Sequence, residues 1–187
     1  MLRTLPQTRD YSQLYRLAGA AIFTLIMILS ARVTIEIGIV PFTMQPLAVL
    51  LSGMVLGARD GLLSQALYVV LIAAGLPFDA RGLGTAALFG PTGGYLIGFI
   101  AAAGVTGWLV ERGTTRLWQR WLAGVAGILV IYLFGIVVLK MVTGMDWSAA
   151  WTAGVAPFIL PDLAKAVIAA ALAEGGRSLL LRQGISG

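Results

Sequence analysis

The sequence predicts an all-α membrane protein, folded as a bundle of six transmembrane helices. Of its 187 residues, 59% are hydrophobic and only 11% are charged, and the mean hydropathy is +0.92. Such a composition cannot supply the polar surface of a soluble domain. Each helical span needs about 20 apolar residues, so the length accommodates about six spans with short connections. We expect one transmembrane domain over residues 17–182, between an N-terminal arm (1–16) and a short tail (183–187).

Six apolar runs give the expected helices in order: 17–31, 44–56, 62–76, 93–110, 122–142 and 155–181. The second and third runs are short, and the polar turn 57–61 separates them. Residues 77–92 and 144–154 are expected to be loops. The first of these mixes glycine, aromatic and charged residues, which is typical of a folded lid.

Charge placement predicts the orientation in the membrane. Nine of the 13 Lys and Arg residues fall in the arm, the second and fourth connections and the C-terminal end. Cytoplasmic loops carry the positive excess, so both termini are expected in the cytoplasm. The same rule explains the net charge of +5 without a nucleic-acid partner.

The residue types exclude several kinds of chemistry. Cysteine and histidine are both absent, which removes disulfides, thiol nucleophiles, most zinc sites and any Ser/His triad. An intramembrane enzyme that used Asp162 as acid or base would lack histidine and cysteine partners. We therefore expect no enzymatic activity, no metal site and no bound cofactor.

Asp162 and Lys165 are ionisable residues inside the sixth apolar run. They lie three residues apart, so they share one face of a helix. Ionisable groups within a span are costly and usually face a cavity or each other. The pair therefore indicates either a ligand site or an internal ion pair that fastens the bundle.

A second unusual stretch is the hexapeptide 90–95 (GPTGGY) at the start of the fourth run. Its glycines allow close backbone approach and Tyr95 offers a polar tip on an aromatic body, features that suit a ligand wall. The same residues also suit a loop-to-helix junction with Pro91 at the first helical position. Gln45, Tyr95 and Asp162 are expected at similar depth on the outer side, which predicts a mostly apolar pocket for a small molecule.

Four stretches carry a resemblance to a known family: residues 40–50 (VPFTMQPLAVL), 75–78 (GLPF), 90–99 (GPTGGYLIGF), and Pro157 and Phe158 with Asp162 and Lys165. At these positions the sequence resembles the BioY family, the substrate-binding S components of energy-coupling factor (ECF) transporters that capture biotin. The resemblance implies a six-helix S component in a prokaryotic cell membrane. It also implies biotin as transported ligand, a membrane coupling protein and two cytoplasmic ATPase subunits as partners, and contact with membrane lipid.

From these matches and the chemistry of biotin we expect Asp162 to accept from the ureido NH groups, with Lys165 and the Gln45 amide satisfying other polar atoms. Tyr95 and Phe78 would cover the apolar rings, and Thr43 and Gly94 complete the expected site. Arg81 is the candidate for the carboxylate, or else a solvent-exposed loop charge.

The first helix departs from the family pattern. S components often dock through Ala-x-x-x-Ala on this helix, whereas here Ala18 is followed by Ile22, and only Ala20 with Thr24 approximates the spacing. No phosphate-binding Gly-x-x-x-x-Gly-Lys-Ser/Thr loop occurs, so a partner would have to hydrolyse ATP. The alternatives are an S component for another vitamin, an intramembrane enzyme that uses Asp162, and a structural subunit.

Overall fold

The structure, a computed structural model, describes residues 13–113 and 116–182. Within these residues, five helical segments are long and apolar enough to cross a membrane. They are α1 (Gln13–Arg32), α2 (Gln45–Ala73), α4 (Gly93–Arg112), α5 (Leu117–Thr143) and the segment Trp147–Ser178, which includes most of α7 (Ile159–Arg182). Of the predicted arm, only residues 13–16 are described, and they begin α1; the rest of the arm and the predicted tail 183–187 lie outside the described residues.

Helix α1 packs mainly against α2 along one face, formed by Ala20, Phe23, Thr24, Met27 and Ala31. These residues recur every three or four positions, as a helix requires for one buried stripe. The Thr24 hydroxyl donates a 2.9 Å hydrogen bond to the backbone oxygen of Ser64 on α2. The opposite side of α1 exposes large apolar side chains, as a lipid-facing helix does.

Helix α2 reverses direction at Gly57, which adopts φ +84° and ψ −178°. The halves on either side of Gly57 run antiparallel, because Gln45 hydrogen-bonds Tyr68 and Ser52 hydrogen-bonds Gln65. The Glu111 carboxylate accepts from the backbone N–H of Ala58 (2.9 Å), which satisfies a donor freed at the reversal. The sequence predicted two runs and a polar turn at 57–61. The turn prediction was too long, since only Gly57 leaves helical geometry.

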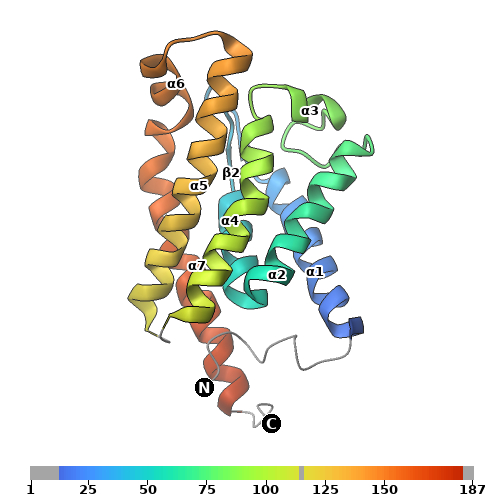
Figure 1. Ribbon diagram of the computed structural model, residues 1–187, viewed down its shortest axis with the longest axis vertical. Helices are drawn as coiled ribbons and strands as arrows, with labels where there is room; N and C mark the ends of the chain where they lie inside the picture. Colours follow the sequence, from blue (N-terminus) through green and yellow to red (C-terminus); the bar gives the residue numbers. More distant parts are fainter. Residues whose placement is uncertain (1–12, 114–115, 183–187) are drawn as a thin grey trace.

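Helix α4 lies between α2 and α5 and packs closely on both (Figure 1). Small residues permit this approach: a Cβ atom at Gly94 would overlap the backbone oxygen of Phe134, and one at Gly53 would overlap that of Ala103. Helix α7 completes the bundle against α2 and α5. Close backbone contact is the usual basis of helix association in lipid.

One end of the bundle, here called the loop end, carries short elements that the sequence did not predict. Strands β1 (Thr34–Ile35) and β2 (Phe42–Thr43) pair antiparallel, α3 (Thr85–Phe89) lies within the predicted 77–92 loop, and η1 (Ala156–Phe158) precedes α7. The expectation of a loop at 144–154 was wrong for most of its length, because α6 (Trp147–Gly154) is helical. Asp146 caps this helix by accepting from the Ala149 N–H (2.7 Å).

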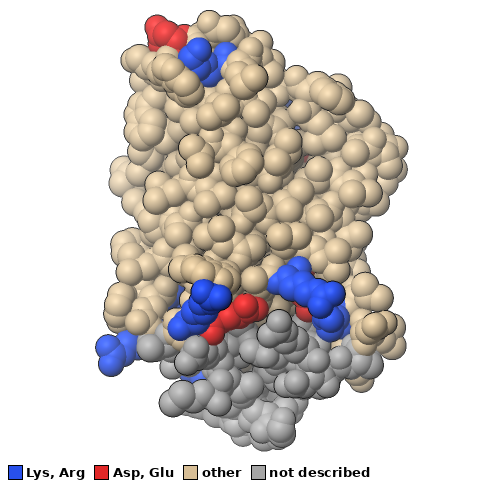
Figure 2. All heavy atoms as spheres, viewed as in Figure 1, with Lys and Arg blue, Asp and Glu red and all other residues tan. Residues whose placement is uncertain are grey.

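Helix α1 begins and α7 ends at the opposite end of the bundle (Figure 1), and ion pairs tie the helices together there. Arg16 of α1 pairs with Asp60 of α2, and Arg120 of α5, only 2% exposed, pairs with Glu174 of α7. Figure 2 shows charged groups at both ends of the viewed face and a broad, largely uncharged band between them. That distribution is expected of a protein embedded in a bilayer.

Candidate ligand-binding site

A cavity opens at the loop end, with about 640 Å³ of space free of protein atoms, including space open to solvent. Its walls come from the segment around β2, the 77–92 loop, and helices α4, α5 and α7. The residues that line it are Val40, Pro41, Thr43, Gln45, Pro46, Asp79, Ala80, Arg81, Thr92, Tyr95, Leu96, Phe99, Ile131, Tyr132, Phe158, Asp162 and Lys165. The lining is mostly apolar with a few convergent polar groups, as in sites for small organic molecules.

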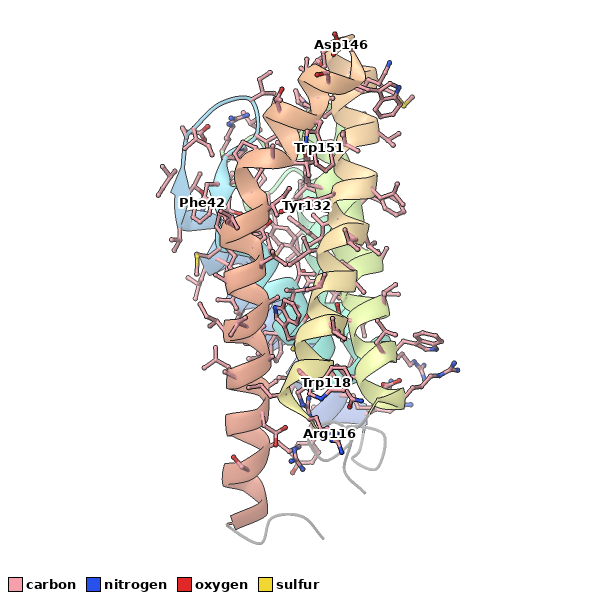
Figure 3. All side chains as sticks on the ribbon, turned by 90° about the vertical axis from the view of Figure 1, so that its left-hand side faces the viewer. Phe42, Arg116, Trp118, Tyr132, Asp146 and Trp151 are labelled. Atoms are coloured by element: carbon pink, nitrogen blue, oxygen red, sulfur yellow. The ribbon has the colours of Figure 1, made fainter. Side chains whose placement is uncertain are left out.

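Asp162 is the central polar group of this cavity and is held from two helices. Its Oδ1 accepts from Lys165 Nζ at 2.7 Å, and its Oδ2 accepts from the Tyr132 hydroxyl of α5 at 2.8 Å. Asp162 and Lys165 are 3% and 4% exposed, so their mutual neutralisation offsets the desolvation of two charges. Figure 3 shows Tyr132 in the space between α5 and α7.

Lys165 also connects α7 to β2. Its Nζ donates to the backbone oxygen of Thr43 at 2.7 Å and lies 4.0 Å from the ring centre of Phe42. A cation over an aromatic face is an attractive contact, more so when both groups are desolvated. The ammonium group is therefore fixed in position before any ligand arrives.

Gln45 starts a chain of hydrogen bonds that leads away from the cavity. Its Oε1 accepts from the Thr43 hydroxyl (3.1 Å) and its Nε2 donates to the Tyr68 hydroxyl (2.9 Å). Tyr68 in turn donates to the backbone oxygen of Phe78 (3.1 Å). This chain joins both halves of α2 to the 77–92 loop and orients the amide.

Tyr95 forms one wall of the cavity, and two glycines leave the space that its side chain fills. Its hydroxyl donates to the backbone oxygen of Gly154 at 2.8 Å. A Cβ atom at Gly135 would overlap the Tyr95 ring, and one at Gly154 would overlap its hydroxyl. The segment 90–95 is a loop-to-helix junction, but α4 begins at Gly93, so the prediction that Pro91 is the first helical residue was wrong. The segment also places Tyr95 in the cavity wall.

Arg81 lies at the cavity mouth and pairs with Glu36 of the 32–43 segment. The Arg81 Nη2 is 2.7 Å from Glu36 Oε2, and Nη2 also donates to the backbone oxygen of Gly38 (3.1 Å). The hydrogen bond from the Arg81 side chain holds the pKa of Glu36 below its ordinary value. Asp79 braces the same loop, because its carboxylate accepts from the backbone N–H groups of Arg81 (3.0 Å) and Gly84 (2.7 Å).

The model of the BioY family matches residues 5–182. The chain belongs to the BioY family. A protein named biotin transporter BioY from Thermotoga maritima is 45% identical over 159 residues, which are 84% of this chain and 93% of that protein. Another of that name, from Rhizobium etli, is 40% identical over 151 residues, or 76% of this chain and 79% of that protein.

The fold is also similar to a solved structure described as the S-component for biotin from an ECF-type ABC transporter. The TM-score is 0.83, and the match covers 90% of this chain and 94% of the other at 21% sequence identity. The arrangement of helices in this BioY-family chain is therefore similar to that of the solved structure.

Most residues that the sequence assigned to the site are brought together. Six of the eight line the cavity: Thr43, Gln45, Arg81, Tyr95, Asp162 and Lys165. The other two, Phe78 and Gly94, are not among the lining residues. Phe78 packs against the hydrophobic core, and Gly94 lies where α4 meets α5. The structure gives these two residues packing roles.

Sequence reasoning missed Tyr132 and Asp79, which both line the cavity. Tyr132 is the one tyrosine in the fifth apolar run, where a core aromatic is the ordinary expectation. In the sequence, Asp79 is one charged residue among others in the 77–92 loop. Its burial (4% exposed) distinguishes it, and burial of a loop acid has no local signal in a sequence.

Proposed function

We propose that this BioY-family chain is the membrane-embedded S component of a biotin uptake transporter, which captures biotin from the outer side of the membrane. The observation that carries the proposal is the buried Tyr132–Asp162–Lys165 cluster in the wall of the loop-end cavity. Relatives at 40% and 45% identity are named biotin transporters. The chain is proposed to be a binding subunit with no enzymatic activity, and biotin is its transported ligand and not a cofactor.

The cavity offers groups that match each part of biotin. A carboxylate oxygen has two lone pairs, so Asp162 has acceptor capacity left for ureido N–H donors after its bonds to Tyr132 and Lys165. Lys165 and Gln45 would meet the ureido oxygen and other polar atoms. Tyr95, Phe99 and Phe158 supply apolar surface for the fused rings and the valerate chain.

The carboxylate of biotin would meet Arg81 at the cavity mouth. Guanidinium groups bind carboxylates through paired hydrogen bonds, and Arg81 lines the cavity with a side chain that is 30% exposed. A ligand in this orientation has its ureido ring deep against α7 and its charged end near water. Such a pose leaves no charge of the ligand buried without a partner.

We further propose six transmembrane segments, with the two halves of α2 counted separately and both termini in the cytoplasm of a prokaryotic cell. Twelve residues precede Gly57 in α2 (45–56) and 16 follow it (58–73), which at 1.5 Å per residue is about 18 Å and about 24 Å. Both halves are shorter than the hydrocarbon core of about 30 Å, but the reversal between them lies at the end of the bundle where α1 begins, because Asp60 pairs with Arg16 and the Ala58 N–H donates to Glu111. The loop end and its cavity would then face outward.

Transport would require partners, namely an ECF coupling protein in the membrane and two cytoplasmic ATPases. The sequence contains no phosphate-binding loop of its own. On α1, Ala20 and Thr24 are buried against the bundle, whereas Ala18 and Ile22 face outward. The outward face of α1 therefore presents alanine at position 18 and isoleucine at position 22. An Ala-x-x-x-Ala pattern would present a small residue at both positions.

A competition experiment tests the ligand. The purified protein in detergent is loaded with radiolabelled biotin, and unlabelled biotin, thiamine or riboflavin is added. Displacement by biotin alone is the expected result. If the folded protein binds no labelled biotin, it is titrated with labelled thiamine and labelled riboflavin. Binding of either would make the chain an S component of another specificity, and binding of none would favour a structural role for the Asp162–Lys165 pair.

A further inference from the structure

Two segments at the loop end hold each other through a reciprocal pair of arginines. Arg32, at the base of the β1–β2 hairpin, donates to the backbone oxygen of Pro77. Arg81, from the 77–92 loop, reaches back to Glu36 and Gly38 at the tip of the hairpin. Each segment thus contributes one guanidinium to the other, at the base and at the tip respectively.

The two arginines differ in their relation to the cavity. Arg81 lines it, whereas Arg32 is not among the lining residues. The carboxylate of Glu36 accepts hydrogen bonds from the Arg81 guanidinium. Arg81 Nη2 is 2.7 Å from Glu36 Oε2, and Arg81 Nε is 3.2 Å from both carboxylate oxygens. Glu36 therefore occupies the same guanidinium that the proposed function assigns to the carboxylate of the ligand.

Arg81 has a second acidic neighbour, Asp79, but that residue is fixed. Both carboxylate oxygens of Asp79 accept from backbone N–H groups of its own loop, and the residue is 4% exposed. The Glu36 side chain is 53% exposed and sits on the hairpin tip. An incoming carboxylate would therefore displace Glu36 and leave Asp79 in place.

We propose that Glu36 is an internal competitor for Arg81, displaced when a carboxylate ligand binds, and that it thereby sets the affinity for the charged end of the ligand. The inference rests on the proposed function, because it takes biotin as the ligand. Exposed ion pairs are weak, so a ligand carboxylate can replace Glu36 at little cost. Displacement frees the hairpin tip, while Arg32 and Pro77 still hold its base.

The test compares wild-type protein with Glu36→Gln, using biotin and biotin methyl ester, which lacks the charge. If Glu36 competes, Glu36→Gln raises the affinity for biotin about two- to fivefold and leaves that for the ester unchanged. Arg81→Gln should lower the affinity for biotin and not that for the ester. Arg32→Gln is the matched control, since it opens the base contact and should change both affinities by the same factor.

Three results would overturn the proposal. Equal loss of both affinities in Glu36→Gln would show that the ion pair only holds the lid, and unchanged affinities would show that Glu36 has no influence on binding. In both cases wild-type protein binds biotin, so the proposed function survives. A folded wild-type protein that binds no biotin would overturn the proposed function and this inference together. Thermal unfolding of each variant in detergent verifies folding.

Discussion

The Tyr132 hydroxyl of α5 and the Asp162 carboxylate of α7 are joined by a 2.8 Å hydrogen bond in the wall of the loop-end cavity. Lys165 occupies the other oxygen of the same carboxylate. Two helices therefore determine how Asp162 is oriented. A carboxylate held at both oxygens is organised for a ligand before the ligand binds, which lowers the entropic cost of recognition.

Removal of the Tyr132 hydroxyl should weaken biotin binding without unfolding the protein. In Tyr132→Phe, Asp162 keeps Lys165 but loses its second donor, so we expect an affinity about tenfold lower. Tyr95→Phe is the matched control, because its hydroxyl binds the backbone oxygen of Gly154 and not Asp162. Equilibrium titration of both variants measures the effect, and a larger loss in Tyr95→Phe would contradict the role given to Tyr132.

Loss of one partner of the buried ion pair should destabilise the protein. Lys165→Met leaves the Asp162 carboxylate buried without its cation, a change that costs about 3–5 kcal/mol in comparable sites. The double variant Lys165→Met/Asp162→Asn removes both charges and should regain part of this stability while failing to bind biotin. Denaturation in detergent measures the stabilities. A double variant less stable than Lys165→Met would refute the charge argument.

A methyl group at Gly135 should displace Tyr95, which forms part of the cavity wall. The added Cβ atom would overlap the Tyr95 ring, so Gly135→Ala should move that ring, lower biotin affinity and destabilise the protein by about 1–3 kcal/mol. Gly175→Ala is the control, because its Cβ would meet no atom within 4 Å and α7 is helical there. Equal behaviour of the two variants would show that Tyr95 tolerates displacement.

Cysteine labelling tests the six-segment topology, and the chain suits it because it has no cysteine of its own. We expect Leu83→Cys, in the exposed 77–92 loop, to react with a membrane-impermeant maleimide on intact cells. Arg59→Cys, just beyond the reversal at Gly57, should react only after permeabilisation. If α2 were a single span, Arg59 would lie at membrane depth and the cysteine would stay unreactive in both conditions.

The sequence predicted the long helices well, because lipid imposes a minimum apolar length that composition reveals directly. The cavity residues Asp162 and Lys165 were also predictable, since ionisable groups in an apolar run are rare and functional by default. Strands β1 and β2 have only two residues each, too few for any periodic pattern to appear. Helix α6 had a usable signal in Asp146, a favourable N-cap residue, which the expectation of a loop overlooked.

Other features depend on contacts between distant parts of the chain. Glu36 and Arg81 are 45 residues apart, and no local pattern pairs them. Arg120 is buried at the start of α5, where Glu174 on α7, 54 residues away in the sequence, pairs with it. Gly94 lies where α4 packs closely on α5, 40 residues from Phe134, whose backbone oxygen a Cβ atom at Gly94 would overlap. Tertiary context decides each of these roles.

The most direct measurement is calorimetric titration of the purified protein with biotin, beside Asp162→Asn and the control Asp146→Asn. Asp146 is an exposed helix cap outside the cavity, and asparagine also caps helices, so that control should bind like the wild type. The account predicts saturable binding of about one biotin per chain, lost in Asp162→Asn and kept in Asp146→Asn. Unchanged biotin affinity in a folded Asp162→Asn variant would contradict it.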